Sequence, residues 1–449
     1  DTMRATRGRF GRWLPRAAAA GSALLLASCL SSGGGGATGL SAAPMERDLD
    51  LSAERLERLD AAMKAYVADG GLAGAVVMIH EDGREVFSEA YGWRDREASA
   101  PMREDTIFRI ASQTKALTSV AILMLMEEGR LTLSDPLGKH LPEWSRTTVA
   151  VAKPGGGYDV VPAKRAITLR DLLTHTAGVS YGTGPGEAAW KEAGVYSWYF
   201  ADKREPVADV VRRMASLPMA AQPGEQFVYG YGTDILGVVV ETISGQTLDA
   251  FLRQRLIEPL GMVDTHFCLP PEKAPRLAVV YSARAGGLER AGEPGALEGW
   301  QHVGQGHYLN GPCVAFAGGA GLVSTAADYS RFLEMLRRDG ELDGRRYLSP
   351  KSVELMRSNH IASTLNQTGA GPFFGGGQGF GLGFRITTDV GASGQPGSKG
   401  DYGWGGAYHS TYWVDPEQEI TVAYMTQLIP AGGLDDHAKL RALIHSALE

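Results

Sequence analysis

The stretch FRIASQTKALTSVAILMLMEEG, from Phe108 to Gly129, decides the fold and points to the chemistry of this chain. The nearly continuous apolar run in its second half predicts a helix that lies centrally in the core. Ser112 and Lys115 stand near its beginning, and residues three apart share one face of a helix, so the amine can reach the hydroxyl. Free backbone N–H groups at a helix N-terminus also favour an anion formed beside them. The pattern suits a serine nucleophile, although Ser-x-x-Lys alone also fits a capping serine and a surface lysine.

The composition is that of a globular protein. The chain has 449 residues, 44 Lys+Arg, 51 Asp+Glu and a net charge of -7, with 44% hydrophobic residues. These values exclude a disordered or coiled-coil chain. No basic stripe interleaved with aromatic residues occurs, so nucleic acid is not an expected partner. The ten histidines form no HxxEH or HExxH pair and the cysteines form no cluster, so we expect neither a metal nor another cofactor.

The N-terminal residues 1–29 have the layout of a lipoprotein-type signal peptide. Five arginines up to Arg16 precede an apolar stretch, and Leu26-Ala27-Ser28-Cys29 resembles the lipobox of bacterial lipoproteins. We predict that Cys29 carries a lipid and that residues 30–45 form a flexible linker. The protein would then be exported, periplasmic or anchored to the outer membrane of a bacterium, with membrane contact only through that lipid. A plain secretory signal with a chance cysteine is the alternative.

Periodicity in the rest of the chain predicts an α/β (α+β) fold. Residues 46–132 and 311–449 are expected to form one α/β domain, in which an antiparallel sheet is flanked by helices. Its predicted elements are a helix over 51–68, strands over 74–80, 85–92, 381–387, 407–414 and 420–427, and a helix over 434–448. Residues 133–310 are expected to be mostly helical with long loops, with helices over 169–176, 208–216 and 235–243. If Cys29 is lipidated, Cys268 and Cys313 remain for a disulfide, which the sequence alone cannot pair.

Five segments in order resemble the serine β-lactamase and penicillin-recognising superfamily, in particular class C β-lactamases and the family VIII carboxylesterases. They are residues 108–144, 167–178, 223–241, 318–336 and 403–416, and together they span most of the chain from residue 51 onward. The resemblance implies the β-lactamase/transpeptidase-like fold, with Ser112 as the nucleophile and Lys115 as its partner.

The resemblance extends to two further motifs, each with one departure. Tyr229-Gly230-Tyr231 matches Tyr-x-Asn of the β-lactamases, so Tyr229 carries over and the asparagine does not. Trp404-Gly405-Gly406 occupies the place of Lys-Thr-Gly, and its tryptophan resembles the family VIII esterases. Loss of that lysine removes the cation that would attract the carboxylate of a penicillin or a peptide terminus. Without the resemblance, Tyr229 and Trp404 could each be interpreted as an aromatic side chain that only packs against its neighbours.

The resemblance also implies how a substrate would be held. The backbone N–H groups of Ser112 and Ala407 would bind the oxyanion, and the substrate pocket would include Tyr231, Trp404, Gly405 and Gly406. Either Lys115 or Tyr229 would accept the serine proton, and the sequence leaves this choice open.

A second serine pattern, Gly178-Val179-Ser180-Tyr181-Gly182, matches the Gly-x-Ser-x-Gly elbow of α/β-hydrolases. That elbow needs a strand before the serine and a helix after it. Here a predicted helix precedes the serine and a Gly/Pro-rich loop follows, so Ser180 is not expected to be the nucleophile. His175, which precedes this motif, is interpreted as a hydrogen-bonded structural histidine.

Together these features predict a serine hydrolase that cleaves short-chain carboxylic esters through an acyl-enzyme on Ser112, with weak β-lactam hydrolysis. The expected partner is therefore a small-molecule ester. Alternatives are a class C-like β-lactamase or D-amino-acid peptidase, an acyltransferase that uses an alcohol instead of water, and a non-catalytic cell-envelope lipoprotein.

Overall fold

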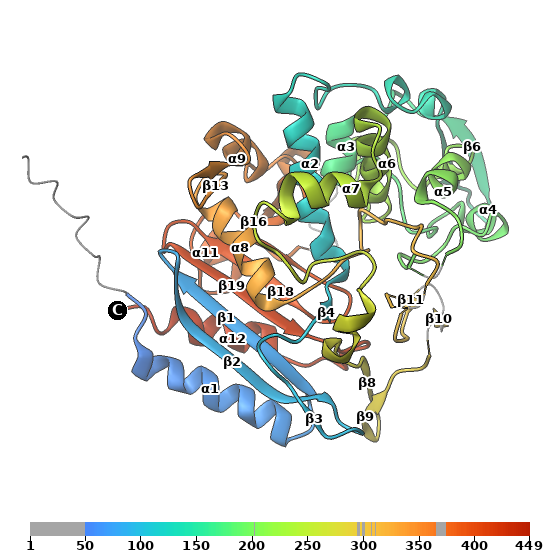
Figure 1. The fold of residues 1–449 in the computed structure, drawn as a ribbon. Helices are drawn as coiled ribbons and strands as arrows, with labels where there is room; N and C mark the ends of the chain where they lie inside the picture. Colours follow the sequence, from blue (N-terminus) through green and yellow to red (C-terminus); the bar gives the residue numbers. More distant parts are fainter. Residues whose placement is uncertain are drawn as a thin grey trace, which may run out of the picture. The chain divides into compact units, whose positions relative to one another are not determined.

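An eight-stranded sheet crosses the molecule in the order β15–β16–β17–β18–β19–β1–β2–β3 (Figure 1). The structure is a computed structural model that describes residues 50–449 except 202, 294–296, 299–300, 307, 310 and 365–373. Residues 49–449 form one compact unit. The predicted signal peptide, the linker and Cys29 lie outside the described residues.

The sheet joins the two ends of the body of the chain. Strand β1 (Gly74–Glu81) pairs antiparallel with β19 (Ile420–Thr426) on one side and with β2 (Arg84–Asp95) on the other. This confirms the predicted antiparallel sheet. Its other strands are β3 (Ala100–Pro101), β15 (Gln378–Phe380), β16 (Arg385–Thr387), β17 (Tyr402–Gly405) and β18 (Thr411–Asp415).

Two of the predicted strands are wrong in their bounds. In the segment 381–387 only residues 385–387 form a strand, β16. Residues 381–384 form the turn that connects β15 to β16, and Gly383 in this turn has a φ of +109° that favours glycine. The predicted strand 407–414 starts too early, since residues 406–410 form the turn between β17 and β18. Strand β17 itself was not predicted, because its two interleaved glycines weaken the strand pattern.

Helices cover both faces of the sheet (Figure 1). On one face α1 (Ala53–Ala68) and α12 (Asp436–His445) share a core cluster with Val77 and Ile79 of β1. On the other face α2 (Thr114–Glu127) and α8 (Ala326–Arg337) share a cluster with Val76 and Met78. Alternate residues of β1 therefore serve opposite cores, as the period of two in a strand requires.

The middle region contains the predicted helices and also strands that were not predicted. Its helices are α3 (Leu169–Leu173), α4 (Glu187–Glu192), α5 (Val207–Met214), α6 (Gly232–Ser244) and α7 (Leu248–Leu252). A small sheet in the order β6–β5–β7 adds the strands Tyr158–Pro162, Thr148–Ala152 and Pro218–Met219. The β5–β6 hairpin turns at three consecutive glycines, which was a usable sequence signal.

The remaining elements are short. They are the helices α9 (Pro350–Met356) and α11 (Val390–Ser393), the 3₁₀ turns η1 (Ala111–Gln113), η2 (Leu137–Lys139), η3 (Pro142–Ser145) and η5 (Pro271–Arg276), the π turn η4 (Arg253–Ile257), and the strand pairs β4 (Phe108–Arg109) with β12 (Val323–Ser324), β8 (Tyr281–Arg284) with β9 (Gly287–Arg290), β10 (Leu297–Glu298) with β11 (Gln301–His302), and β13 (Glu341–Leu342) with β14 (Arg345–Arg346). Within the described part of the chain no single helix is long and apolar enough to cross a membrane; α6 followed by residues 248–257 meets that test only as a pair bent by 79°.

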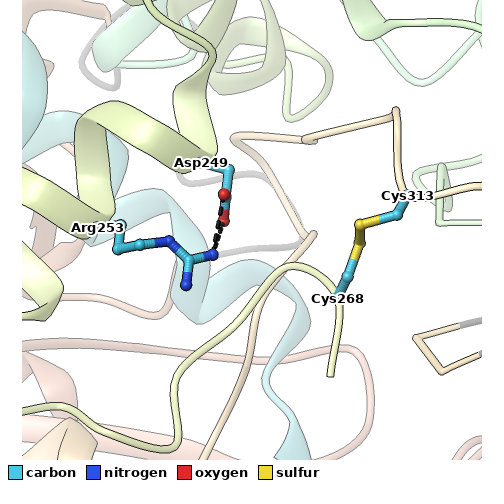
Figure 2. The surroundings of a disulfide bond; sticks show 4 residues. All are labelled: Asp249, Arg253, Cys268 and Cys313. Atoms are coloured by element: carbon cyan, nitrogen blue, oxygen red, sulfur yellow. Dashed lines mark hydrogen bonds and ion pairs between the residues drawn. A yellow bond between two sulfur atoms is a disulfide. The ribbon is translucent and has the colours of Figure 1, made fainter. Parts of the chain in front are cut away.

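A disulfide joins Cys268 and Cys313, whose Cα atoms are 5.9 Å apart (Figure 2). The structure thus supplies the pairing that the sequence left open. Asp249 and Arg253 of the α7 region form an ion pair nearby, at 2.9 Å. The bridge connects two long loops and limits the conformations of the unfolded chain.

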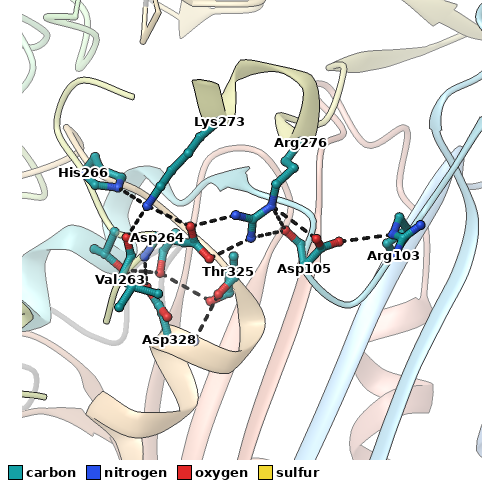
Figure 3. A network of polar contacts seen from close by, with 11 residues as sticks. Arg103, Asp105, Val263, Asp264, His266, Lys273, Arg276, Thr325 and Asp328 are labelled. Atoms are coloured by element: carbon teal, nitrogen blue, oxygen red, sulfur yellow. Dashed lines mark hydrogen bonds and ion pairs between the residues drawn. The ribbon is translucent and has the colours of Figure 1, made fainter. Parts of the chain in front are cut away.

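A network of polar contacts supports the segment that leads into β4 (Figure 3). Asp264 binds Arg276 at 2.7 Å and Lys273 at 3.0 Å, and Arg276 also donates to the backbone oxygen of Asp105. Asp328 of α8 accepts from the backbone N–H of Asp264 at 2.7 Å. The network fixes η5 and α8 against the loop that precedes Phe108.

Candidate active site

Ser112 lies in the short turn η1, between β4 and α2. The predicted helix therefore begins later than Phe108, because residues 108–109 pair with β12 instead. Ala111 has a φ of +42°, a conformation uncommon for a residue with a side chain. Such local strain is concentrated at functional sites. It turns the chain sharply just before Ser112, whose side chain lines a large cavity.

Lys115 is fully buried and its amine is fully engaged. Nζ donates to Ser112 Oγ at 3.2 Å, to Tyr181 Oη at 3.0 Å and to the backbone oxygen of Gly319 at 2.7 Å. A lysine buried in an apolar helix needs such partners. The structure therefore brings Ser112 and Lys115 together, as the spacing of three predicted.

Tyr229 lies at the same site, with its ring next to Lys115. Its hydroxyl accepts a hydrogen bond from Trp404 Nε1 at 3.0 Å, and Lys115 Nζ lies 4.7 Å from the centre of its ring. The Tyr181 ring lies edge-on to that of Tyr229, with the two ring centres 5.7 Å apart. Burial and then the neighbouring Tyr229 raise the pKa of Tyr181 well above its ordinary value.

Tyr181 is thus a site residue that the sequence analysis missed. It belongs to the segment Gly178–Gly182, which was judged only for its serine. The Ser180 hydroxyl donates to the backbone oxygen of Thr183 at 2.7 Å and accepts from its N–H at 3.0 Å. No strand precedes Ser180 within residues 174–186, all of which the structure describes, so the elbow geometry is absent there.

A buried carboxylate behind Lys115 was also missed. Asp234 near the start of α6 accepts from the N–H of Gly319 at 3.0 Å, and Gly319 in turn accepts from Lys115. Burial raises the pKa of Asp234 to about 6, while the charge of Lys115 acts in the opposite direction. A Cβ at Gly319 would lie 2.5 Å from Asp234 Oδ2, so the close approach requires glycine.

His175 packs under the tyrosines as a buried, uncharged ring. It lies beyond the end of α3, with its ring centre 4.6 Å from that of Tyr229. The expectation that it is hydrogen-bonded is wrong, because neither ring nitrogen has a partner among the described residues. Burial, followed by the charge of Lys115, lowers its pKa well below the ordinary value. Its neighbours Phe227 and Phe380 supply no hydrogen-bond acceptor to the ring.

The hairpin turn at residues 406–410 closes the site from the side of the sheet. A Cβ at Gly406 would lie 2.5 Å from the backbone oxygen of Ile110, so glycine permits the hairpin to approach the Ser112 segment. Ala407 follows directly and lines the cavity with Ser112. This placement is compatible with the predicted pair of backbone N–H donors.

Residues of α12 hold this turn. His409 Nε2 and Asp436 Oδ1 are 2.8 Å apart, and His437 Nε2 donates to the backbone oxygen of His409 at 2.9 Å. Tyr424 donates to the second oxygen of Asp436 at 2.5 Å. Burial would raise the pKa of Asp436, but its bond and charge interaction with His409 hold that pKa below its ordinary value.

Of the four predicted substrate-binding residues, Trp404, Gly405 and Gly406 line the cavity. The prediction for Tyr231 is wrong. Its side chain is fully buried, donates to the backbone oxygen of Ser197 at 2.6 Å and stacks on Trp190. Tyr231 directly precedes α6, and its ring points into the core of the middle region instead of the cavity.

The cavity has a volume of about 1250 Å³ and two chemically different ends. One end contains Ser112, Tyr181, Tyr229, Trp404 and Ala407. The other end, between the sheet and α12, contains Arg385, His437 and Arg441. The cavity therefore holds cations even though position 404 is not lysine.

Two clusters have the composition of metal ligands. His409, Asp436 and His437 place ligand atoms within 4.8 Å of one another, as do Asp401, Asp415 and His445. In the first cluster the two imidazoles stack at 4.1 Å and 17°, so no ion can lie in the plane of both rings. In the second cluster Asp401 is already paired with Arg441. Neither arrangement supports a metal centre, and the absence of a cofactor remains a prediction.

The comparisons agree with this geometry. The family model Beta-lactamase matches residues 59–446. Protein Rv1367c of Mycobacterium tuberculosis is 36% identical over 381 residues, covering 82% of this chain and 89% of its own. Esterase EstB of Burkholderia gladioli is 31% identical over 407 residues, covering 87% and 94%. The solved structure of EstCE1, a hydrolase with promiscuous acyltransferase activity, has a TM-score of 0.74 at 27% identity, covering 87% of this chain and 99% of its own. The chain therefore belongs to the beta-lactamase family of serine hydrolases and has its fold.

Proposed function

We propose that this protein is a carboxylesterase of the family VIII type, which cleaves short-chain carboxylic esters through an acyl-enzyme on Ser112. The observation that carries the proposal is the 3.2 Å contact between Lys115 Nζ and Ser112 Oγ at the wall of the cavity. A buried amine in contact with a serine hydroxyl is an arrangement that activates a nucleophile.

The reaction proceeds in two steps. Ser112 Oγ attacks the ester carbonyl while its proton moves to the group formed by Lys115 and the tyrosines. The N–H groups of Ser112 and Ala407 hold the oxyanion, and the C–O bond to the alcohol breaks as the alkoxide takes up that proton. Water then attacks the acyl carbonyl, releases the carboxylic acid and restores the serine hydroxyl. Tyr181 positions Lys115, and Trp404 positions Tyr229.

Ester substrates are favoured over β-lactams by the residue at position 404. Trp404 directs its indole N–H to Tyr229 and places an aromatic wall where the resembling β-lactamases have a lysine. An aromatic wall suits a short acyl chain. The names of Esterase EstB and of the hydrolase EstCE1 point in the same direction. Weak β-lactam hydrolysis would be a side activity of the same acyl-enzyme chemistry.

The test is steady-state kinetics on p-nitrophenyl butyrate and a chromogenic cephalosporin, with the full chain, Ser112→Ala and the matched control Ser180→Ala. We expect ester turnover to dominate, to fall at least about 10⁴-fold in Ser112→Ala and to persist in Ser180→Ala. Comparable cephalosporin turnover would favour a β-lactamase. An active Ser112→Ala variant would reject the nucleophile, and lack of any turnover or labelling by a covalent serine probe would favour a non-catalytic lipoprotein.

We also propose that the protein is exported and anchored through a lipid on Cys29. The support is the Leu26-Ala27-Ser28-Cys29 sequence after an apolar stretch. Membrane fractionation of Cys29→Ala tests the anchor, and unchanged fractionation would reject it.

A further inference from the structure

Arg385 lines the far end of the cavity. It is half-buried on β16, and its guanidinium has no hydrogen bond or ion pair to any residue that the structure describes. Arg441 of α12, in contrast, donates to Asp401 and to the backbone oxygen of Pro396 at 2.7 Å. A guanidinium stays protonated, so Arg385 brings a positive charge to this end of the cavity, which Asp435 also lines.

Asp401, whose charge acts on Arg385, is already bound by other residues. Asp401 accepts from Arg441 through one oxygen and from Thr387 Oγ through the other. Burial lowers the pKa of Arg385 and the neighbouring Arg441 lowers it further, whereas Asp401 acts only in the opposite direction. A partly desolvated cation of this kind is costly unless an anion joins it.

Strand register places Arg385 where a ligand can reach it from Ser112. Arg385 pairs with Gly403 and Gly403 pairs with Trp413, so the three form a row on the α12 face of the sheet. Arg385 and Trp413 of this row both line the cavity. Trp404 points to the opposite face, toward Tyr229.

The edge of β17 is open between these two faces. Pairing with β16 ends at Gly403, and no described strand pairs with Gly405 on that side. Gly405 has no side chain and lines the cavity. A flexible chain can therefore pass around this edge, from the Ser112 end to Arg385.

We propose that Arg385 binds a carboxylate of the substrate while the ester carbonyl lies at Ser112, so that the preferred substrates are esters that carry a free carboxylate. The planar guanidinium matches a carboxylate through two parallel hydrogen bonds. Arg385 is then a specificity-determining residue. This inference rests on the proposed esterase function.

The experiment compares kcat/KM for matched anionic and neutral esters. On the acyl side, the probes are mono-(4-nitrophenyl) adipate and its neutral amide, 4-nitrophenyl 5-carbamoylpentanoate. On the alcohol side, they are 4-butyryloxybenzoate and 4-butyryloxybenzamide. We expect the full chain to prefer the anionic member of one pair by roughly 10- to 100-fold, and that pair identifies which portion carries the carboxylate. The preference should weaken at high salt.

The variants are Arg385→Gln, Arg385→Lys and the matched control Arg345→Gln, an exposed arginine of β14. Arg385→Gln should abolish the preference while neutral esters stay within about twofold, Arg385→Lys should restore part of it, and the control should keep it. An absent preference in the full chain would overturn the carboxylate site alone. Equal loss of both esters in Arg385→Gln would also overturn it, because Arg385 would then serve the fold. Failure of the proposed function differs from both, since neutral esters would not be turned over in a Ser112-dependent way.

Discussion

The basic side chains at the two ends of the cavity differ in how many hydrogen-bond partners the protein gives them. At the Ser112 end, Lys115 donates to three acceptors, one of them the serine itself. At the α12 end, Arg385 donates to none of the described residues, although Arg441 beside it is paired. Lys115 is fully buried and Arg385 is half-buried, but only Lys115 has hydrogen-bond partners within the described part of the protein.

This difference in hydrogen bonding distinguishes groups that take part in the reaction from groups that recognise the substrate. Reacting groups are most effective when their hydrogen bonds are formed before the substrate arrives, because no reorganisation is then needed during the reaction. A group that recognises a substrate keeps its hydrogen-bonding capacity for the ligand. The Ser112 end has the first character and the Arg385 end has the second.

Among the variants that compare the two ends, the largest expected effect concerns the two tyrosines at the Ser112 end. Tyr181→Phe removes an acceptor from Lys115 and should lower kcat by roughly 10²-fold. Tyr229→Phe should lower kcat at least as much if Tyr229 accepts the serine proton. Steady-state kinetics across pH checks both, because a changed environment of Lys115 should move the pH profile.

The control for the tyrosine variants is Tyr402→Phe, which removes a buried hydroxyl that has no hydrogen-bond partner in the described structure. It should leave kcat within about twofold. If Tyr181→Phe behaves in the same way, the contact with Lys115 has no catalytic importance and the assignment of preorganised groups to this end fails.

The next expected effect is on the pH dependence of the free energy of unfolding, which we compare for one buried histidine at each end of the cavity. His175 at the Ser112 end has a pKa well below 6.5, so the unfolded chain binds more protons once the pH falls below that value. Stability is therefore lost as the pH falls from 7 to 5, because the unfolded ring takes up a proton that the folded ring does not. His175→Phe should remove that part of the pH dependence, measured as the free energy of unfolding in urea at both pH values.

His437 at the Arg385 end gives the contrast. Burial and His409 also lower its pKa, but its Nε2 donates to a backbone oxygen. Its replacement by Phe should therefore reduce stability at pH 7 as well as at pH 5. A pH dependence of stability that is unchanged in His175→Phe would contradict the neutral, partnerless ring described at the Ser112 end.

The smallest expected effect concerns Tyr231, which tests how far the Ser112 end of the cavity extends into the core. Tyr231 lies behind the cavity, and Tyr231→Phe removes only its bond to Ser197. We expect the free energy of unfolding to fall by about 1 kcal/mol and kcat to stay within about twofold. A tenfold loss of kcat at unchanged melting temperature would show that the cavity extends to Tyr231 after all.

Local patterns in the sequence predicted a large part of the fold. The helix that follows Ser112, the hairpin of β1 and β2 and the final strand β19 were all predicted from apolar periodicity. Lys115 was placed beside Ser112 because a spacing of three on a helix has few geometric outcomes. Strand β17 and the turn that carries Ala407 were poorly predicted, since glycine leaves little periodic signal.

The rest of the site depends on contacts between distant segments. Tyr181 meets Lys115 from 66 residues away, and Gly319 meets it from 204 residues away. Tyr229 and Tyr231 are two residues apart and equally aromatic, yet one lines the cavity and the other packs in the core. Nothing local to either residue distinguishes them.

By itself the sequence determined the local geometry of this protein: which stretch forms the buried helix, and that a lysine in its first turn lies beside the serine just before it. The tertiary structure alone decided that Tyr181 accepts from the lysine, which cysteines pair, and that Arg385 lines the cavity with no hydrogen bond to a described residue. The physical reason is that side-chain spacing within an element follows from backbone geometry. Contacts between elements depend on how the whole chain packs.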